Sequence, residues 1–113
     1  MTTPADRREL VAQLPPLPAR DEQAINAFLD AIWAESGLAQ HTLDGYRRDL
    51  QGFARWREGR GGGLAGADRA ALFDYLAWRT RHGWSQRSNA RLLSALRAFF
   101  ALQLRNGARA DDP

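Results

Sequence analysis

The chain has 113 residues, 44% of them hydrophobic and 26% charged, with a formal net charge of +3 and no cysteine. This balance fits a single globular domain with a modest core, and the missing cysteines exclude disulfides and thiolate chemistry. The sequence has no run of 18 apolar residues and no apolar N-terminal stretch, which excludes a membrane span and a secretory signal and makes the cytoplasm the expected location.

The first 20 residues contain all but one of the five prolines. The run Leu14-Pro15-Pro16-Leu17-Pro18 cannot continue a helix, because proline lacks the amide hydrogen and clashes with the preceding turn. Few apolar side chains are available to anchor this segment to a core. We therefore predict a flexible leader without fixed structure over residues 1–20.

Two amphipathic helices are predicted next. The first spans residues 21–36 and is followed by Gly37, and the second spans residues 42–58 and is followed by Gly59. Apolar side chains recur at helical spacing in both segments, which places them on one side of each helix. They are Ile25, Phe28, Leu29, Ile32 and Trp33 in the first helix, and Leu43, Tyr46, Leu50, Phe53 and Ala54 in the second.

Two further helices follow a glycine-rich loop at residues 61–63. The third begins at Asp68 and the fourth near Ser85, since both side chains are good N-terminal caps; Gly83 and Gly107 end them. Each of the four helices is thus followed by a glycine, the residue best suited to the left-handed conformation at a helix C-terminus. The predicted inward side chains are Leu72, Phe73, Leu76 and Trp78 in the third helix, and Leu92, Leu93, Leu96, Phe99, Phe100 and Gln103 in the fourth.

No segment alternates apolar and polar residues for long enough to predict a strand. The predicted fold class is therefore all-α, a compact four-helix domain over residues 21–108. We interpret residues 109–113, which include Asp111-Asp112-Pro113, as the start of a linker to a further C-terminal domain.

The basic residues are unevenly distributed along the chain. All 16 are arginine; residues 1–46 hold seven acids and three arginines, whereas residues 47–110 hold four acids and 13 arginines. A GC-rich genome would explain the preference for arginine over lysine, but it would not explain this distribution. The excess of positive charge in residues 47–110 produces an electrostatic field that attracts phosphate backbones. The forked guanidinium group can also hydrogen-bond both phosphates and guanine edges.

The fourth predicted helix has the most informative polar face. Arg87, Arg91 and Ser94 lie at positions i, i+4 and i+7, beside small alanines and without an acid. A solvated helix face usually mixes charge signs. We therefore predict that this face contacts DNA, since small residues permit close approach to a groove; the alternative is a solvated face kept soluble by charge.

The second predicted helix offers a weaker candidate. Arg48 points away from its apolar side and Arg47 lies on the flank. Thr42 stands at the helix start, where a hydroxyl and free backbone N–H groups can bind a phosphate. Asp44 and Asp49 are close in sequence, so the charge signs on this helix are mixed.

We predict no catalytic residue, metal or cofactor within these 113 residues. No glycine-rich loop precedes a lysine, no histidine stands near a plausible nucleophile, and no two carboxylates share an apolar face. The only histidines, His41 and His82, are far apart, which argues against a zinc site. Tyr46 and Tyr75 fall within apolar stripes and are assigned to the core.

Two segments resemble signatures of the tyrosine site-specific recombinase, or phage integrase, family. Residues 41–50 (HTLDGYRRDL) are similar to the second-helix signature of that family, and residues 88–100 (SNARLLSALRAFF) are similar to its fourth-helix signature. The ending at 111–113 resembles the linker that precedes the family's catalytic domain. The sequence departs from the family at Ala39 and His41, where Ser and Asn are frequent, which puts the N-terminal capping of the second helix in doubt.

The resemblance implies a SAM-like, core-binding domain that forms one side of a C-shaped clamp on DNA, with helices two and four across the major groove. The nucleophilic tyrosine and the phosphate-activating residues would belong to the catalytic domain, which cuts one strand through a phosphotyrosine intermediate without a metal or nucleotide cofactor. The implied partners are duplex DNA, a partner recombinase in a tetramer that resolves chromosome dimers during cell division, and a DNA translocase. The residues that the resemblance assigns to DNA contact are Thr42, Arg47, Arg48, Arg87, Ser88, Arg91 and Ser94.

Other functional classes remain open. A stand-alone DNA-binding regulator would need a compact helix-turn-helix unit, which the connections after the second and third helices do not favour. A helical protein-interaction module would direct its arginines at an acidic partner, and salt-dependent binding to any duplex would distinguish it from the DNA-binding classes. Within the family, the arm of a phage-type integrase is a further alternative.

Overall fold

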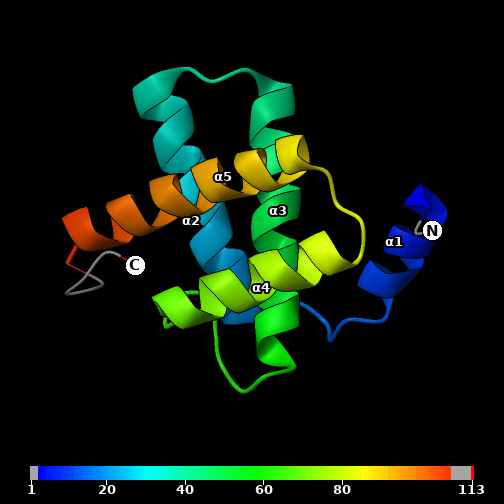
Figure 1. The fold of residues 1–113 in the computed structure, drawn as a ribbon. Helices are drawn as coiled ribbons and strands as arrows, with labels where there is room; N and C mark the ends of the chain where they lie inside the picture. The colour runs from blue at the N-terminus through cyan, green and yellow to red at the C-terminus, as the bar shows by residue number, and fades with distance from the viewer. Residues whose placement is uncertain (1–2, 108–112) are drawn as a thin grey trace.

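The computed structural model describes residues 3–107 and Pro113. These residues form five helices and no strand: α1 (Pro4–Ala12), α2 (Ala19–Ser36), α3 (Gln40–Glu58), α4 (Arg69–Arg81) and α5 (Gln86–Arg105). Helices α2 and α3 form an antiparallel pair, and α4 and α5 cross this pair on one side (Figure 1). The predicted all-α fold is confirmed, and α2–α5 correspond to the four predicted helices. In this part of the chain, no helix combines the length and the apolar character needed to span a bilayer.

Helix α3 is the central element, since it contacts α2, α4 and α5. Phe99 of α5 packs edge-on against Phe28 of α2, with ring centroids 5.5 Å apart, and against Phe100 at 5.3 Å. The core joins α2, α3, α4 and α5 and the loop that precedes α4. Its largest fully buried side chains are Phe28, Phe53, Phe99, Phe100, Ile25, Leu50, Leu64 and Leu92.

Two aromatic side chains that were predicted to face inward lie at the surface. Trp33 is 54% exposed and Phe73 is 58% exposed. Helix α4 is apolar on more than one side, and the side that it buries presents Tyr75 and Trp78 to the aromatic residues of α3 and to Trp84. Burying these two large rings removes more apolar area from water than burying Phe73 would, which decides the rotation of the helix.

The predicted left-handed glycines are confirmed at three of four helix ends. Gly37, Gly83 and Gly107 have φ values of +61°, +91° and +74°. The prediction is wrong for Gly59, whose φ is −65°, because the chain makes one more tight turn after α3. The left-handed conformation falls instead on Gly61, with φ at +78°.

The prediction that residues 1–20 lack regular structure is wrong for Pro4–Ala12, which form α1, and for residues 19–20, which begin α2. Thr3 and Asp6 make a capping box: the Thr3 hydroxyl accepts from the Asp6 amide and the Asp6 carboxylate accepts from the Thr3 amide. Proline at the first helical position suits this start, because its missing N–H has no partner there. The prediction of a linker at 109–113 falls outside the described residues, apart from Pro113.

The segment after α1 is attached to the bundle by Arg55 of α3. Its guanidinium donates from Nε to the Pro15 carbonyl at 2.8 Å and from Nη2 to the Leu14 carbonyl at 3.0 Å. Leu14 and Leu17 are partly buried against the core. Helix α1 lies at the edge of the bundle (Figure 1), where its residues line one pocket together with residues of α3 and α4.

Candidate nucleic-acid interface

The N-terminal halves of α3 and α5 meet around a surface pocket of about 410 Å³, which we call the α3–α5 pocket. Five of the seven predicted DNA-contacting residues line it, so the structure brings together residues that lie up to 52 positions apart in sequence, Thr42 and Ser94. The complete lining is His41, Thr42, Tyr46, Arg87, Ser88, Arg91 and Ser94.

Hydroxyl groups and an exposed cation form one wall of this pocket. The cap predicted at Ser85 is confirmed: its Oγ accepts from the Ser88 amide at 3.0 Å and donates to the Ser88 Oγ at 3.1 Å. Ser94 donates to the Ala90 carbonyl at 3.2 Å. Arg87 is exposed and has no hydrogen-bond or ion-pair partner within the described part of the chain. This wall offers hydrogen-bond donors and positive charge to solvent.

The opposite wall begins with an uncapped helix end. Ala39 is the N-cap of α3 and its side chain makes no cap hydrogen bond, as the departure from the family pattern at this position indicated. The amides of Thr42 and Leu43 already donate to the Ala39 carbonyl. The first two amides of α3 are therefore the ones left to meet solvent or an anion.

Arg91 is held by a buried carboxylate from α3. Its Nε donates to Asp49 Oδ2 at 2.7 Å and its Nη2 donates to Asp49 Oδ1 at 3.1 Å, a two-pronged pair. Asp49 also lies 3.5 Å from the Nη1 of Arg79, whose side chain is 3% exposed. Helix α5 has no acid on its polar face, but α3 supplies one from across the helix interface. Arg91 is therefore a structural cation as well as a member of the pocket.

A glycine makes room for this ion pair. A Cβ on Gly45 would lie 3.3 Å from both Cδ and Nε of Arg91, tighter than ordinary contact. Gly45 precedes Asp49 by four residues and so lies one turn away on the same side of α3. The guanidinium of Arg91 thus crosses α3 over the bare backbone of Gly45 to reach Asp49.

Two pKa values reflect this arrangement. The hydrogen bonds that Arg91 donates to Asp49 raise the pKa of Arg91, against the smaller opposing effect of its partial burial. Burial raises the pKa of Tyr75 to about 12, in spite of the nearby Arg79 cation, so the phenol remains protonated at neutral pH. Tyr75 is 4% exposed, which confirms its assignment to the core.

Replacing Arg91 with alanine should therefore cost more stability than a surface change. Loss of the two hydrogen bonds to a buried carboxylate is expected to lower the free energy of unfolding by about 1–3 kcal/mol. Arg87→Ala is the matched control on the same helix face, and it should stay within about 0.5 kcal/mol of the wild type. Urea melts of both variants measure the difference. Equal stabilities would show that the Arg91–Asp49 pair contributes nothing net.

The other two predicted arginines do not line the α3–α5 pocket. Arg47 donates from Nη1 to the Asn26 side-chain oxygen and lines a shallow site between α2 and α3 with Asp30 and Trp33. Arg48 points to the opposite flank of α3 and lines a separate pocket beside α1. Successive helix positions are about 100° apart, which separates these neighbours.

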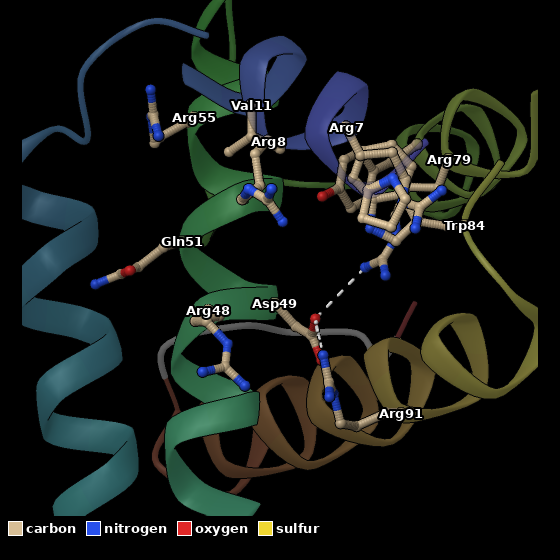
Figure 2. Close-up of a pocket in the computed structure, with 13 residues that line it drawn as sticks. Arg7, Arg8, Val11, Arg48, Asp49, Gln51, Arg55, Arg79, Trp84 and Arg91 are labelled. Carbon is tan, nitrogen blue, oxygen red and sulfur yellow. Dashed lines mark hydrogen bonds and ion pairs between the residues drawn. The ribbon is translucent and has the colours of Figure 1, made fainter. Parts of the chain in front are cut away.

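That second pocket, which we call the arginine pocket, has a volume of about 440 Å³ and lies between α1 and α3–α5 (Figure 2). Six arginines and a single carboxylate, Asp49, line it, together with apolar groups that include Val11 and Trp84. Arg91 lines both pockets, so they adjoin. The arginines are Arg7, Arg8, Arg48, Arg55, Arg79 and Arg91.

The arginine pocket was not predicted from the sequence, because helix α1 was not predicted. The sequence Thr3-Pro4-Ala5-Asp6 satisfies a capping box with proline at the first helical position, and this signal was sufficient to predict a helix start. Arg7 and Arg8 then fall in its first turns. The burial of Arg79 had no comparable signal, since a lone arginine within a helix predicts an exposed side chain.

The chain matches a known family over most of its length. Residues 25–107 match the family described as phage integrase, N-terminal SAM-like domain. This range begins within α2 and ends after α5, so it contains most of α2 and all of α3, α4 and α5. No solved structure gives a significant match.

Several curated proteins named tyrosine recombinase XerD are similar to this chain. The protein from Xanthomonas campestris pv. campestris is 65% identical over 112 residues, which are 99% of this chain and 35% of the relative. The Pseudomonas aeruginosa protein is 52% identical over 89 residues (79% and 30%), and the Yersinia pestis protein is 40% identical over 94 residues (83% and 31%). The chain thus spans about a third of the length of these relatives. The signatures in α3 and α5 favour a XerD-type sequence over XerC or a phage integrase, in agreement with these names.

Proposed function

This chain belongs to the phage integrase N-terminal SAM-like domain family, and we propose that it is the DNA-clamping domain of a XerD-type tyrosine recombinase. The observation that supports this most directly is the α3–α5 pocket. The N-terminal halves of two helices meet at one surface there. The residues that line this pocket contribute hydroxyls and guanidiniums, and none of them is a carboxylate. Groups of these types hydrogen-bond phosphate oxygens and base edges.

In this proposal the N-terminal halves of α3 and α5 enter the major groove. Arg87 and Ser88 reach the DNA from α5, and Thr42 reaches it from the start of α3. Arg91 lies between them, fixed by Asp49 yet with 42% of its side chain exposed. Arg47 and Arg48 flank this contact from the two sides of α3, where they meet backbone phosphates rather than bases.

The activity of the whole recombinase follows from the same proposal. The full enzyme would cleave one strand through a phosphotyrosine, with a catalytic domain that forms the other side of the clamp and without metal or nucleotide cofactor. It would act with a partner recombinase in a tetramer on DNA, resolve chromosome dimers before cell division under the control of a DNA translocase, and work in the cytoplasm. Residues 1–20, 21–108 and 109–113 would then serve as leader, DNA-binding domain and linker, with α1 as an ordered part of the leader.

A salt-dependent titration tests the DNA-binding step. Duplex binding by the 113-residue chain should weaken steeply with salt, and Arg87→Gln should reduce the slope of log K against log salt by about 0.9, the value for one phosphate contact. Arg97→Gln is the matched control, since Arg97 is exposed on the same helix but lines a groove with α4. Fluorescence anisotropy with a recombination-site duplex and a random duplex gives both slopes.

The random duplex separates two roles of Arg87. If Arg87 reads a guanine edge, its loss should cost roughly 1–3 kcal/mol on the recombination site and less on random DNA. Should the wild type bind no duplex at low salt, the chain is a protein-interaction module and the DNA-binding proposal is wrong. Equal slopes for Arg87→Gln and Arg97→Gln would remove α5 from the interface.

A further inference from the structure

The arginine pocket holds more positive charge than its own carboxylate can balance. Six arginines line it, and their mutual repulsion is only partly relieved by one acid, Asp49, which pairs with Arg79 and Arg91. Figure 2 shows Arg8 reaching down from α1 and Arg48 lying on α3 below it, on the same side of the Asp49–Arg91 pair. Such an arrangement is stabilised when an anion enters.

Four of the six arginines have identified contacts. Arg55 holds the carbonyls of Leu14 and Pro15, and Arg7 donates to the Gly83 carbonyl at 3.3 Å. Arg79 and Arg91 share Asp49. Arg8 and Arg48 have no hydrogen bond or ion pair within residues 3–107, and both are exposed. They are therefore the two guanidiniums available to a ligand.

A buried donor in the same pocket supports a ligand site. Arg79 is 2% exposed, yet its Nε has no hydrogen-bond partner among the described residues. Its guanidinium lies 5.3 Å from the centre of the Trp84 ring and 3.5 Å from Asp49. An unsatisfied buried donor is costly, and Arg79, which carries it, lines the cavity of about 440 Å³.

Phosphate is the anion that fits this set of donors. Guanidinium groups bind its oxygens through paired N–H donors, more strongly than neutral hydrogen bonds would. Because Arg91 lines both pockets, a phosphate in the arginine pocket lies next to the α3–α5 pocket. The adjoining surface points to a nucleic-acid backbone as the source of that phosphate.

We propose that the arginine pocket binds a backbone phosphate of duplex DNA, with Arg8 of α1 and Arg48 of α3 as its direct ligands. The proposal rests on the DNA-binding function above and extends the interface beyond α3 and α5 to α1. The capping box at Thr3, the Arg7–Gly83 hydrogen bond and the Arg55 contacts then position Arg8 over the site.

The double variant Arg8→Gln/Arg48→Gln tests the proposal in the 113-residue chain. Loss of two phosphate contacts should reduce the slope of log K against log salt by about 1.8, and should weaken duplex binding roughly five- to tenfold per contact at 0.1 M salt. Arg97→Gln should leave the slope unchanged. Both changed side chains are exposed and unpaired in the described structure, so circular dichroism melts should coincide with those of the wild type.

The outcomes separate this proposal from the function on which it rests. If Arg87→Gln weakens binding and the double variant does not, the arginine pocket is no part of the interface and the proposal is overturned, while the DNA-binding function stands. If neither changes binding, both this proposal and the proposed contact by α5 are overturned, and if the wild type binds no duplex, the DNA-binding function itself fails. A reduced slope for the double variant supports both.

A second measurement distinguishes DNA from a free phosphate compound. The indole N–H signal of Trp84, assigned with a Trp84→Phe variant, should shift on titration with duplex DNA, and this shift should be lost in the double variant. Inorganic pyrophosphate should compete only weakly, at millimolar concentration. Saturation by micromolar pyrophosphate, without any response to duplex, would make the ligand a small phosphorylated molecule and would overturn the proposal.

Discussion

Truncating Phe99 to alanine should lower the free energy of unfolding by about 3–5 kcal/mol. Phe99 is fully buried and joins two helices, through its contacts with Phe28 of α2 and with Phe100. The variant would lose the transfer free energy of the ring and would leave a cavity that neighbouring helices cannot fill. Domains are stable by only about 5–15 kcal/mol, so this change should bring the fold close to unfolding.

Phe73→Ala is the matched control, because it deletes the same ring from an exposed position, where Phe73 is 58% accessible. It should change stability by about 0.5 kcal/mol at most. Guanidinium melts of both variants, fitted with a common slope, give the difference. Comparable destabilisation by the two changes would mean that α4 buries Phe73 in solution.

Replacing Asp49 with asparagine should cost a similar amount, about 3–5 kcal/mol, for an electrostatic reason. The change keeps the size of the side chain but removes the charge that balances Arg79, which is 3% exposed, and Arg91. Arg79 would then be a buried cation without a counter-ion. Thermal and urea melts at neutral pH measure the loss.

Asp44→Asn is the control for this substitution. Asp44 lies on the same helix but is exposed, and it accepts a hydrogen bond from Gln40. Its replacement should change stability by about 0.5 kcal/mol. Adding Arg79→Met to Asp49→Asn should recover part of the lost stability, because the unbalanced buried charge is removed. No recovery, or no loss in the single variant, would contradict the electrostatic account.

Helices α2–α5 and the caps at Asp68 and Ser85 could be predicted because local rules decide them. The side chains of Asp68 and Ser85 cap α4 and α5 by accepting a hydrogen bond from the backbone amide three residues later, and such contacts depend on neighbouring sequence alone. The apolar spacing in α5 likewise fixed which side is buried. The rotation of α4 could not be predicted in this way, because rings from α3 and Trp84 determine which of its apolar sides is covered.

The candidate site could be predicted only as two separate helix faces. The sequence indicated Thr42 on one helix and Arg87, Ser88, Arg91 and Ser94 on another, and the fold brings them to one pocket. The pairing of Arg91 with Asp49 could not be predicted from the sequence, because the two residues are 42 positions apart and their contact depends on how α3 and α5 cross. The same holds for the arginine pocket, whose residues come from four helices and from the loop between α4 and α5.

The Arg91–Asp49 pair has a consequence for the entropy of binding. A long side chain that becomes immobile on binding costs roughly 0.5–1.5 kcal/mol in lost rotamer freedom. Asp49 and the bare backbone of Gly45 already restrict Arg91 in the free protein. The rotamer freedom of Arg91 is therefore lost when the chain folds, and not when it binds. Arg87 has no such restraint within the described structure. Arg91 is thus a preorganised cation and Arg87 an adaptable one. In the proposed interface, Arg91 would fix the register of docking while Arg87 would adjust to the local shape of the duplex.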